Sequence, residues 1–400
     1  MAYVGINMES VKSKNIEAIL KLLNTQGLMS RKDIALELGL TPATLTMLCA
    51  ELLNEGVLVE KGESPQQNRA GRRKILLGIN YGYKYVLTIS IELPFTIISV
   101  CDLGGEHYAS KELLTNCDMA PELFLRQVAE RGKALLWEAG VERSKLLGVG
   151  VSVPGAVNHQ EGISYRAYRI WDDAVPVCEY LKEYFDCPIL LKNNVRAFAQ
   201  AELTFGHGKT LENLLFLKWG PGVGSAIITN GSIYESGAFK NAEIGHVRVE
   251  PNGQLCRCGR RGCLETKVST HPIVSGIQEL CSQENTPLLW EMVQGNPKAI
   301  TVHTLPKVLA LDEPAVWKVV DEKIQLLAGV VGAILTMLAP DRLIVYGDMF
   351  RLPHFMEHFI EACKHYDPYY DENYIVSSSL GDKIGYIGPL SVVVSELFYK

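Results

Sequence analysis

Residues 245–265 read GHVRVEPNGQLCRCGRRGCLE and place Cys256, Cys258 and Cys263 within eight residues of one another. His246 lies ten positions before the first of these cysteines. Thiolates and an imidazole are the usual ligands of a closed tetrahedral zinc site, and intervening glycines let the backbone turn several side chains toward one point. The alternative is three reduced surface cysteines without a metal. We predict one zinc ion per chain, held by His246, Cys256, Cys258 and Cys263.

The charge of this loop fits a metal site that holds no substrate. Three thiolates on Zn²⁺ leave one net negative charge, which Arg257, Arg260 and Arg261 are placed to offset. Four protein ligands leave no open coordination position, so the predicted zinc is structural rather than catalytic.

The composition is that of an ordinary soluble protein with a large core. The chain has 400 residues, 47% of them hydrophobic, which is enough for two or three domains. Most of its ten cysteines are scattered without a disulfide framework, as in the reducing cytoplasm. The first ten residues lack the apolar core of a secretion signal. Residues 324–340 are uncharged but shorter than the about twenty residues of a membrane span, and they predict a buried helix. We expect a cytoplasmic protein without a membrane partner.

The charge is unevenly divided along the chain. Residues 1–80 carry ten Lys and Arg against eight Asp and Glu, whereas residues 81–400 carry twenty-nine against thirty-seven. A mildly basic module on an acidic body predicts that nucleic-acid contacts are confined to the first eighty residues.

The first eighty residues have the pattern of a winged helix-turn-helix domain. Three apolar stripes with helical spacing run through residues 16–23, 34–38 and 45–52. Ser30 with Asp33 predicts a capping box for the second helix, and Thr41 followed by Pro42 predicts the start of the third. Two short helices joined by a Gly-containing turn are typical of helix-turn-helix proteins.

Two short strands, residues 57–61 and 74–79, are predicted to flank a loop that ends in arginines. Such a wing can enter a minor groove or neutralise phosphates, and the start of the third helix can reach base edges. A three-helix module that contacts a protein instead is the alternative. The predicted DNA-binding residues are Thr41, Ala43, Thr44 and Thr46 on the helix and Arg69, Arg72 and Arg73 on the wing.

The remaining residues, 81–400, alternate strand and helix patterns, which indicates an α/β body. Residues 85–91 and 95–103 predict a hairpin, residues 121–139 a helix, and residues 146–153 a buried strand. The stretch CPILLKN predicts another strand, with a helix over residues 195–205 after it.

The order AEIGH (242–246), CxCGxxGC (256–263) and LE (264–265) resembles the signature of the ROK family of sugar kinases and sugar-responsive regulators. The resemblance covers most of residues 81–400. It implies an α/β, two-lobed, ribonuclease-H-like body, as in sugar kinases, actin and heat-shock ATPases, with ligands in the cleft. It also implies a hinge near residues 206–208 and a carboxy-terminal helix packed against the first lobe.

The resemblance also shows which kinase groups this chain has lost. Residues 90–94 stand where the kinases resemble D-x-G-G-T, so Glu92 would repel phosphate and Pro94 lacks an N–H donor. Asn194 stands where the kinases have the Asp that takes the proton of the attacking sugar hydroxyl. Loss of a general base costs about 10²–10⁴ in rate. The chain is therefore not expected to be an enzyme.

Two further loops differ from those that hold the nucleotide in the kinases. WGPGVGSAI (219–227) stands where the kinases resemble G-T-G-I-G-G-G, with Pro221 in place of the hydroxyl residue. Gly347-Asp348 replaces a Gly-Gly pair and puts a carboxylate near the expected position of adenosine.

At the positions that contact sugar in the family, this chain resembles the family more closely than it does in the phosphate and nucleotide loops. Carboxylates and amides suit hydroxyl pairs because each makes two hydrogen bonds in fixed geometry. These groups could instead merely support the loop, and Arg166 and Arg169 leave open an acidic or phosphorylated ligand. The predicted sugar-binding residues are Asn193, Asn194, Glu243, His246 and Glu265.

Together these patterns predict a transcriptional regulator, most simply a repressor of carbohydrate-utilisation genes, whose degenerate kinase domain senses a sugar. Its expected partners are operator DNA and a carbohydrate effector, and paired half-sites need a homodimer or homotetramer. One alternative is an active ROK sugar kinase fused to a DNA-binding domain. Another is a zinc-stabilised scaffold controlled by a protein partner.

Overall fold

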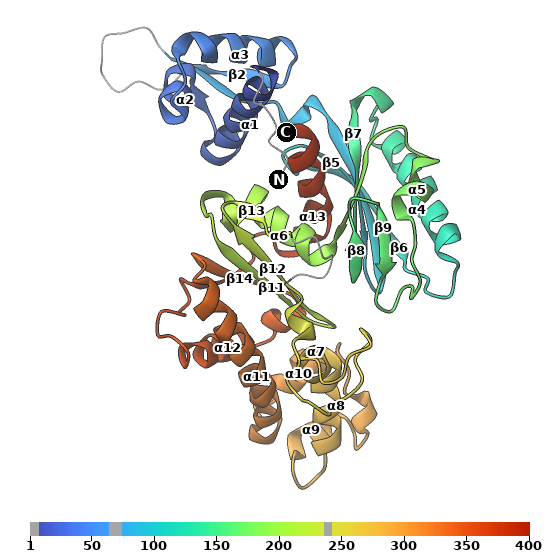
Figure 1. The fold of residues 1–400 in the computed structure, drawn as a ribbon. Helices are drawn as coiled ribbons and strands as arrows, with labels where there is room; N and C mark the ends of the chain where they lie inside the picture. The colour runs from blue at the N-terminus through green and yellow to red at the C-terminus, as the bar shows by residue number, and fades with distance from the viewer. Residues whose placement is uncertain (1–7, 64–73, 236–241) are drawn as a thin grey trace. The chain divides into compact units, whose positions relative to one another are not determined.

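A computed structural model describes residues 8–63, 74–235 and 242–400 (Figure 1). The chain divides into two compact units. Unit 1 comprises residues 1–205 and 382–400, and unit 2 comprises residues 206–381. The boundary after Phe205 coincides with the hinge region implied by the sequence, and the first eighty residues belong to the same unit as the first lobe.

The amino-terminal part of unit 1 contains the three predicted helices, α1 (Met8–Gln26), α2 (Arg31–Leu38) and α3 (Pro42–Asn54). The helix caps are those predicted. The Ser30 hydroxyl accepts from the Asp33 N–H, Gly39 ends α2 in the left-handed conformation at φ 63°, and Thr41 caps α3 ahead of Pro42. These local contacts fix where each helix begins and ends, so the sequence could predict the helix ends.

The sheet of this part has one strand more than predicted. Strands β2 (Leu58–Glu63) and β3 (Ile75–Ile79) are antiparallel, as expected, and β1 (Met29–Ser30) adds to the other edge of β3. A two-residue strand carries no alternation that a sequence pattern could reveal. The predicted wing arginines Arg69, Arg72 and Arg73 lie outside the described residues.

The main sheet of unit 1 has the strand order β10-β7-β4-β5-β6. Strands β10, β7 and β4 are parallel, whereas β4, β5 and β6 form antiparallel hairpins. The predicted hairpin and the buried strand LLGVGVSV are confirmed. The five strands are β4 (Tyr85–Ile91), β5 (Phe95–Asp102), β6 (His107–Leu114), β7 (Leu146–Val153) and β10 (Ile189–Asn193). A separate small hairpin joins β8 (Ala156–Asn158) and β9 (Ile163–Arg166).

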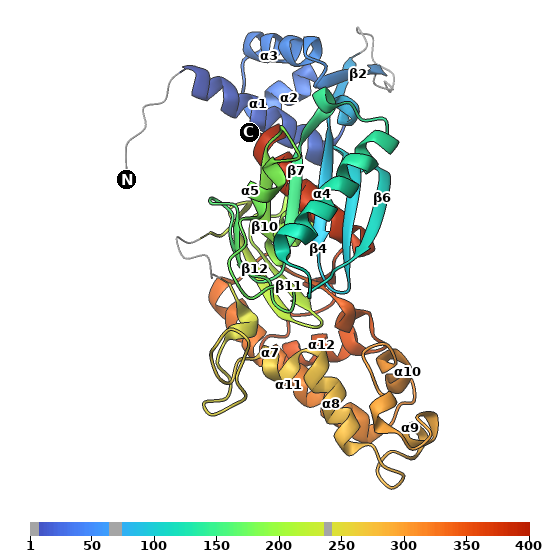
Figure 2. The same ribbon diagram turned by 90° about the vertical axis from the view of Figure 1, so that its right-hand side faces the viewer.

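Helices cover both faces of this sheet (Figures 1 and 2). Helices α4 (Pro121–Glu138) and α5 (Val177–Lys182) pack on one face, and α6 (Asn194–Phe205) and α13 (Ile384–Val393) on the other. Strand β7 explains the arrangement, because its valines point into the α4 side while its glycines face α13. A Cβ atom on Gly150 would lie 2.2 Å from the Pro389 carbonyl oxygen, so α13 approaches more closely than a side chain allows. The predicted packing of the carboxy-terminal helix on the first lobe is confirmed.

Unit 2 is a second mixed sheet with the strand order β13-β12-β11-β14-β15. Trp219 at the end of β11 is fully buried among the rings of Phe350, Phe355 and Phe359, and its indole N–H donates to the Val268 carbonyl oxygen. The strands are β11 (Leu214–Trp219), β12 (Val223–Thr229), β13 (Ser232–Ile233), β14 (Arg342–Tyr346) and β15 (Ile375–Ser377).

The α-helices described in unit 2 all come after Cys263 in the chain, and α12 lies between strands β14 and β15. The predicted buried helix is the carboxy-terminal part of α11, whose inner face is buried up to Leu335, while Met337 and Leu338 are exposed. The helices are α7 (Glu265–Val268), α8 (Thr270–Leu280), α9 (Pro287–Met292), α10 (Leu305–Leu309), α11 (Pro314–Leu338) and α12 (Phe355–Lys364). Over the described residues, every helix is too short or too polar to cross a membrane.

Candidate functional site

The four predicted zinc ligands converge in unit 2. One ligand atom from each of His246, Cys256, Cys258 and Cys263 lies within 4.8 Å of the other three. The Cys258 and Cys263 sulfurs are 3.6 Å apart, and the Cys256 sulfur is 3.7 Å from His246 Nδ1. Tetrahedral ligands with bonds of about 2.3 Å are separated by roughly 3.8 Å. The donor set and its spacing therefore fit a closed zinc centre.

The backbone of the loop brings these side chains together. Gly259 and Gly262 adopt φ values of 87° and 71°, the left-handed region that favours glycine. At Gly262 a Cβ atom would lie 1.6 Å from the Glu250 carbonyl oxygen. The glycines of the sequence motif are thus required by turn geometry and by close chain approach.

Arg260 links the cluster of His246 and the three cysteines to Glu243, one of the predicted sugar-binding residues. Its Nε donates to the Cys258 sulfur over 3.3 Å, and its guanidinium lies 3.6 Å from Glu243. Burial acts to raise the pKa of the Cys258 thiol, but hydrogen bonds from Arg260 lower it below its ordinary value. Burial raises the pKa of Cys256. Arg260 therefore favours a thiolate at Cys258, as a zinc ligand requires.

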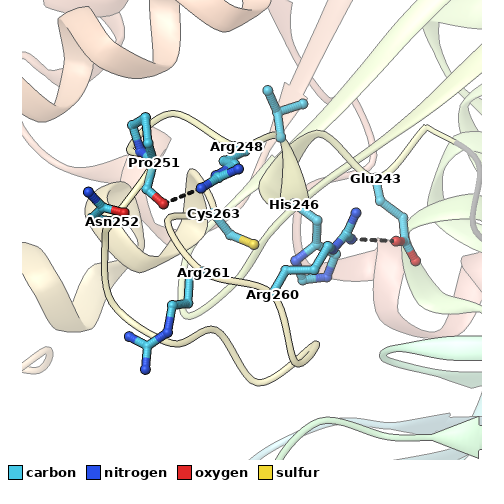
Figure 3. A pocket seen from close by; sticks show the side chains of 9 residues that line it. Glu243, His246, Arg248, Pro251, Asn252, Arg260, Arg261 and Cys263 are labelled. Atoms are coloured by element: carbon cyan, nitrogen blue, oxygen red, sulfur yellow. Dashed lines mark hydrogen bonds and ion pairs between the residues drawn. The ribbon is translucent and has the colours of Figure 1, made fainter.

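Glu265 stands beside the same cluster. Its Oε1 is 3.3 Å from the Cys256 sulfur and 3.7 Å from His246 Nδ1, and its Oε2 faces Gly222 of the glycine loop. An open pocket of about 790 Å³ adjoins the cluster (Figure 3). It is lined by Glu243, His246, Val247, Arg248, Pro251, Asn252, Arg260, Arg261 and Cys263.

The loops at residues 219–227 and 347–348, predicted to differ from the nucleotide loops of the kinases, also meet within unit 2. Asp348 follows Gly347, which has a φ of 121°. A Cβ atom on Gly347 would lie 2.1 Å from the Trp219 carbonyl oxygen, so the two chain segments are in close contact. The Asp348 carboxylate lies 3.7 Å from the position that a Cβ atom of Gly220 would take. The negative charge of Asp348 thus lies next to the glycine-containing loop of residues 219–227.

The remaining predicted sugar residues, Asn193 and Asn194, belong to unit 1. Asn193 ends β10 and its amide donates to the Gly155 carbonyl oxygen over 2.8 Å. Asn194 begins α6, is 4% exposed, and donates from Nδ2 to Glu92 Oε1 over 2.7 Å. This contact between Glu92 and Asn194 was not predicted from the sequence. The 102 positions between them carry no signal for it.

Arg166, which the sequence suggested could favour an acidic ligand, lies beside the carboxylate of Asp172. Its Nε donates to the Asp172 carbonyl oxygen over 3.3 Å and is 3.7 Å from the Asp172 carboxylate. Arg169 occupies the left-handed region at φ 71°.

At the start of α3 the predicted base-reading residues are mostly open to solvent. Thr41, Ala43 and Thr46 are exposed, while half-buried Thr44 exchanges a hydrogen bond of 2.9 Å with the Thr41 hydroxyl. The Thr46 hydroxyl donates to the Pro42 carbonyl oxygen. Methyl groups, rather than bidentate side chains, therefore dominate this surface.

Residues 98–396 match the ROK family. The xylose repressor of Caldicellulosiruptor bescii is 27% identical over 72% of this chain and 72% of its own length. A crystal structure described as a ROK family transcriptional regulator, homologous to the E. coli Mlc protein, has 20% identity and a TM-score of 0.78 and covers 97% of this chain and 98% of its own. A ROK glucokinase from Streptomyces griseus has 20% identity and a TM-score of 0.63 over 76% of this chain and 98% of its own.

These structural similarities confirm the expected fold class, an α/β body of the two-lobed sugar-kinase type. The family match spans about three quarters of the sequence and includes the cysteine cluster and both asparagines of the candidate site. The chain belongs to the ROK family.

Proposed function

We propose that this chain is a DNA-binding transcriptional regulator, a repressor of carbohydrate-utilisation genes, whose body binds a sugar without phosphorylating it. The hydrogen bond from Asn194 to Glu92 carries the proposal. An amide cannot serve as the general base for a sugar hydroxyl. The Asn194 amide also donates to the carboxylate of Glu92, in residues 90–94, which stand where the kinases are expected to have their first phosphate loop. The names of the similar proteins, a xylose repressor and a ROK transcriptional regulator, support the regulatory reading.

DNA binding is assigned to residues 1–80. The exposed start of α3 is the proposed base-reading surface, and its lack of Arg, Asn or Gln favours contacts with thymine methyl groups. Phosphate contacts come from the wing. A homodimer or homotetramer presents two such modules to paired half-sites. The residues proposed to contact DNA are Thr41, Ala43, Thr44, Thr46, Arg69, Arg72 and Arg73.

The residues proposed to bind the sugar are Asn193, Asn194, Glu243, His246 and Glu265. When bound to His246 and the three cysteines, zinc would supply structural stability to the loop that carries Glu243 and Glu265. The distances from Glu265 to the cluster and from Arg260 to Glu243 support this linkage. The predicted cluster thus orders the ligand residues rather than acting on the ligand.

The response to sugar is a coupling free energy between this site and the DNA-binding module. Helix α6 is the proposed connection, because it begins at Asn194 and its last turn contacts α1.

The test starts from duplexes that the full-length protein selects from a randomised DNA library. Fluorescence anisotropy then measures affinity for the selected sequence, with and without a panel of neutral mono- and disaccharides. We expect specific binding that at least one sugar weakens. In parallel, ATP, magnesium and the same sugar should yield no sugar phosphate above background. Steady turnover at ordinary kinase rates, on the order of 1–100 s⁻¹, would favour an active kinase fused to a DNA-binding domain.

A further inference from the structure

The polar groups of unit 1 gather at one edge of its main sheet. Strands β4, β7 and β10 are parallel neighbours, so their carboxyl ends lie at the same edge. Glu92 follows β4, Gly155 follows β7, and Asn193 ends β10. The hydrogen bonds of Asn193 to Gly155 and of Asn194 to Glu92 join the three chain segments there. Ligands of open α/β sheets bind at such an edge.

Helix α6 begins at this edge, and two of its first N–H groups already have side-chain acceptors. The first N–H groups of a helix form a ready anion site when they are available. Here the Val195 N–H donates to Asn194 Oδ1 over 2.8 Å, and the Arg196 N–H donates to Asn193 Oδ1 over 3.2 Å. A phosphate could use these donors only by displacing both asparagine side chains.

The neighbouring loop, residues 92–94, contributes the Glu92 carboxylate rather than an N–H group that could donate to a phosphate. Glu92 is held in place at its backbone, where its carbonyl oxygen accepts from the Thr115 hydroxyl over 2.7 Å. The Thr115 N–H donates to the Pro94 carbonyl oxygen over 3.0 Å, which anchors the other end of the loop. The Glu92 carboxylate therefore contacts Asn194 from an anchored stretch of backbone. Pro94 contributes no N–H.

We propose that this end of the ligand site selects an uncharged sugar and rejects its phosphate ester, with Glu92 as the residue that discriminates. The inference rests on the proposed function, because it assumes that the site binds a sugar. A sugar hydroxyl can donate to a carboxylate and accept from an amide. A phosphate group on the same carbon meets a like charge and two helix N–H groups that already have side-chain acceptors, and such a mismatch weakens binding of the ester.

The test uses matched pairs: D-glucose, D-mannose and N-acetyl-D-glucosamine, each beside its 6-phosphate. Calorimetry with the full-length protein at constant ionic strength measures both members of each pair. We expect the neutral sugar that binds to do so at least about tenfold more tightly than its ester, as like charges impose. Glu92→Gln keeps an acceptor oxygen for Asn194 and removes the charge, so it should narrow that ratio mainly by strengthening ester binding.

Glu112→Gln is the matched control, because Glu112 is exposed on β6 of the same sheet and should leave the ratio unchanged. Tighter binding of a phosphate ester by the unaltered protein, or an unchanged ratio in Glu92→Gln, overturns the inference. A protein that binds DNA and responds to a sugar phosphate contradicts only this inference. A protein that binds neither DNA nor any sugar contradicts the proposed function itself.

Discussion

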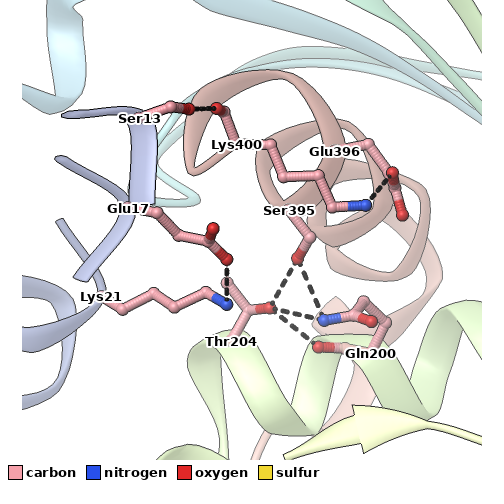
Figure 4. A network of polar contacts seen from close by, with 8 residues as sticks. All are labelled: Ser13, Glu17, Lys21, Gln200, Thr204, Ser395, Glu396 and Lys400. Carbon is pink, nitrogen blue, oxygen red and sulfur yellow. Dashed lines mark hydrogen bonds and ion pairs between the residues drawn. The ribbon is translucent and has the colours of Figure 1, made fainter. Parts of the chain in front are cut away.

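The side-chain amide of Asn24, near the end of α1, donates a hydrogen bond to the Thr204 carbonyl oxygen, in the last turn of α6, over 2.8 Å. The Tyr81 hydroxyl donates to Asn24 Oδ1 over 3.3 Å, so the amide is held from both sides. Thr204 is also linked through its hydroxyl to Ser395 near the carboxy terminus (Figure 4). One helix thus carries an asparagine of the proposed sugar site at its start and a contact with α1 at its end.

Asn24→Ala should reduce the effect of sugar on DNA affinity. Loss of the bond to the carbonyl oxygen of Thr204, a buried residue, should also cost about 1 kcal/mol of stability. The measurement is DNA affinity with and without sugar, from which the coupling free energy follows. Thr25→Ala is the control, since the Thr25 hydroxyl donates within α1, to the Lys21 carbonyl oxygen. Equal coupling in both variants would remove the Asn24 contact from the proposed connection.

Cys258→Ser should abolish tight zinc binding and lower the thermal unfolding temperature, because a structural zinc site stabilises the fold by several kcal/mol. Elemental analysis gives the metal content per chain, expected to fall from one zinc to near zero. Cys117→Ser is the comparison, since Cys117 is exposed and lies outside the cluster. If the Cys258 variant retains both zinc and stability, the assigned ligand set is wrong.

Ala43→Glu should weaken DNA binding by about tenfold or more, because it places a negative charge on the proposed DNA-facing surface. The fold should not suffer, since Ala43 is exposed in the first turn of α3, where an acidic side chain is favourable. Ala134→Glu adds the same charge to an exposed alanine of α4 and should leave DNA affinity intact. Equal loss in both variants would point to net charge rather than to α3.

Asn194→Asp should not restore phosphoryl transfer and should make stability depend on pH. It places a second carboxylate 2.7 Å from Glu92 Oε1, where two negative charges repel and one carboxyl pKa rises. A folded-state pKa above the unfolded value means that stability increases as pH falls through the raised pKa. Thermal unfolding at pH 5 and pH 8 measures this, with a larger deficit relative to the unaltered protein at pH 8. The same deficit at both values would show that the two groups do not interact.

The sequence predicted the features that depend on neighbours in the chain. The Ser30 cap, the Thr41–Pro42 helix start and the cysteine cluster all arise from residues a few positions apart or within one loop. It could not predict the contacts of Asn194 with Glu92 or of Asn24 with Thr204, because 102 and 180 positions separate the partners. Those contacts depend on how strands and helices pack, and single polar residues leave no periodic trace of such packing.

The twelve residues of α6 therefore have to satisfy a rotational phase as well as a length. Each residue of an α-helix advances the chain by about 1.5 Å and turns it by roughly 100°. An insertion or deletion of one residue between Asn194 and Thr204 would change the helix length by little. It would nevertheless swing the Thr204 carbonyl and the hydroxyl beside it to another face of the helix, away from Asn24 and Ser395. Evolution of this chain can thus exchange side chains along α6 far more freely than it can change their number.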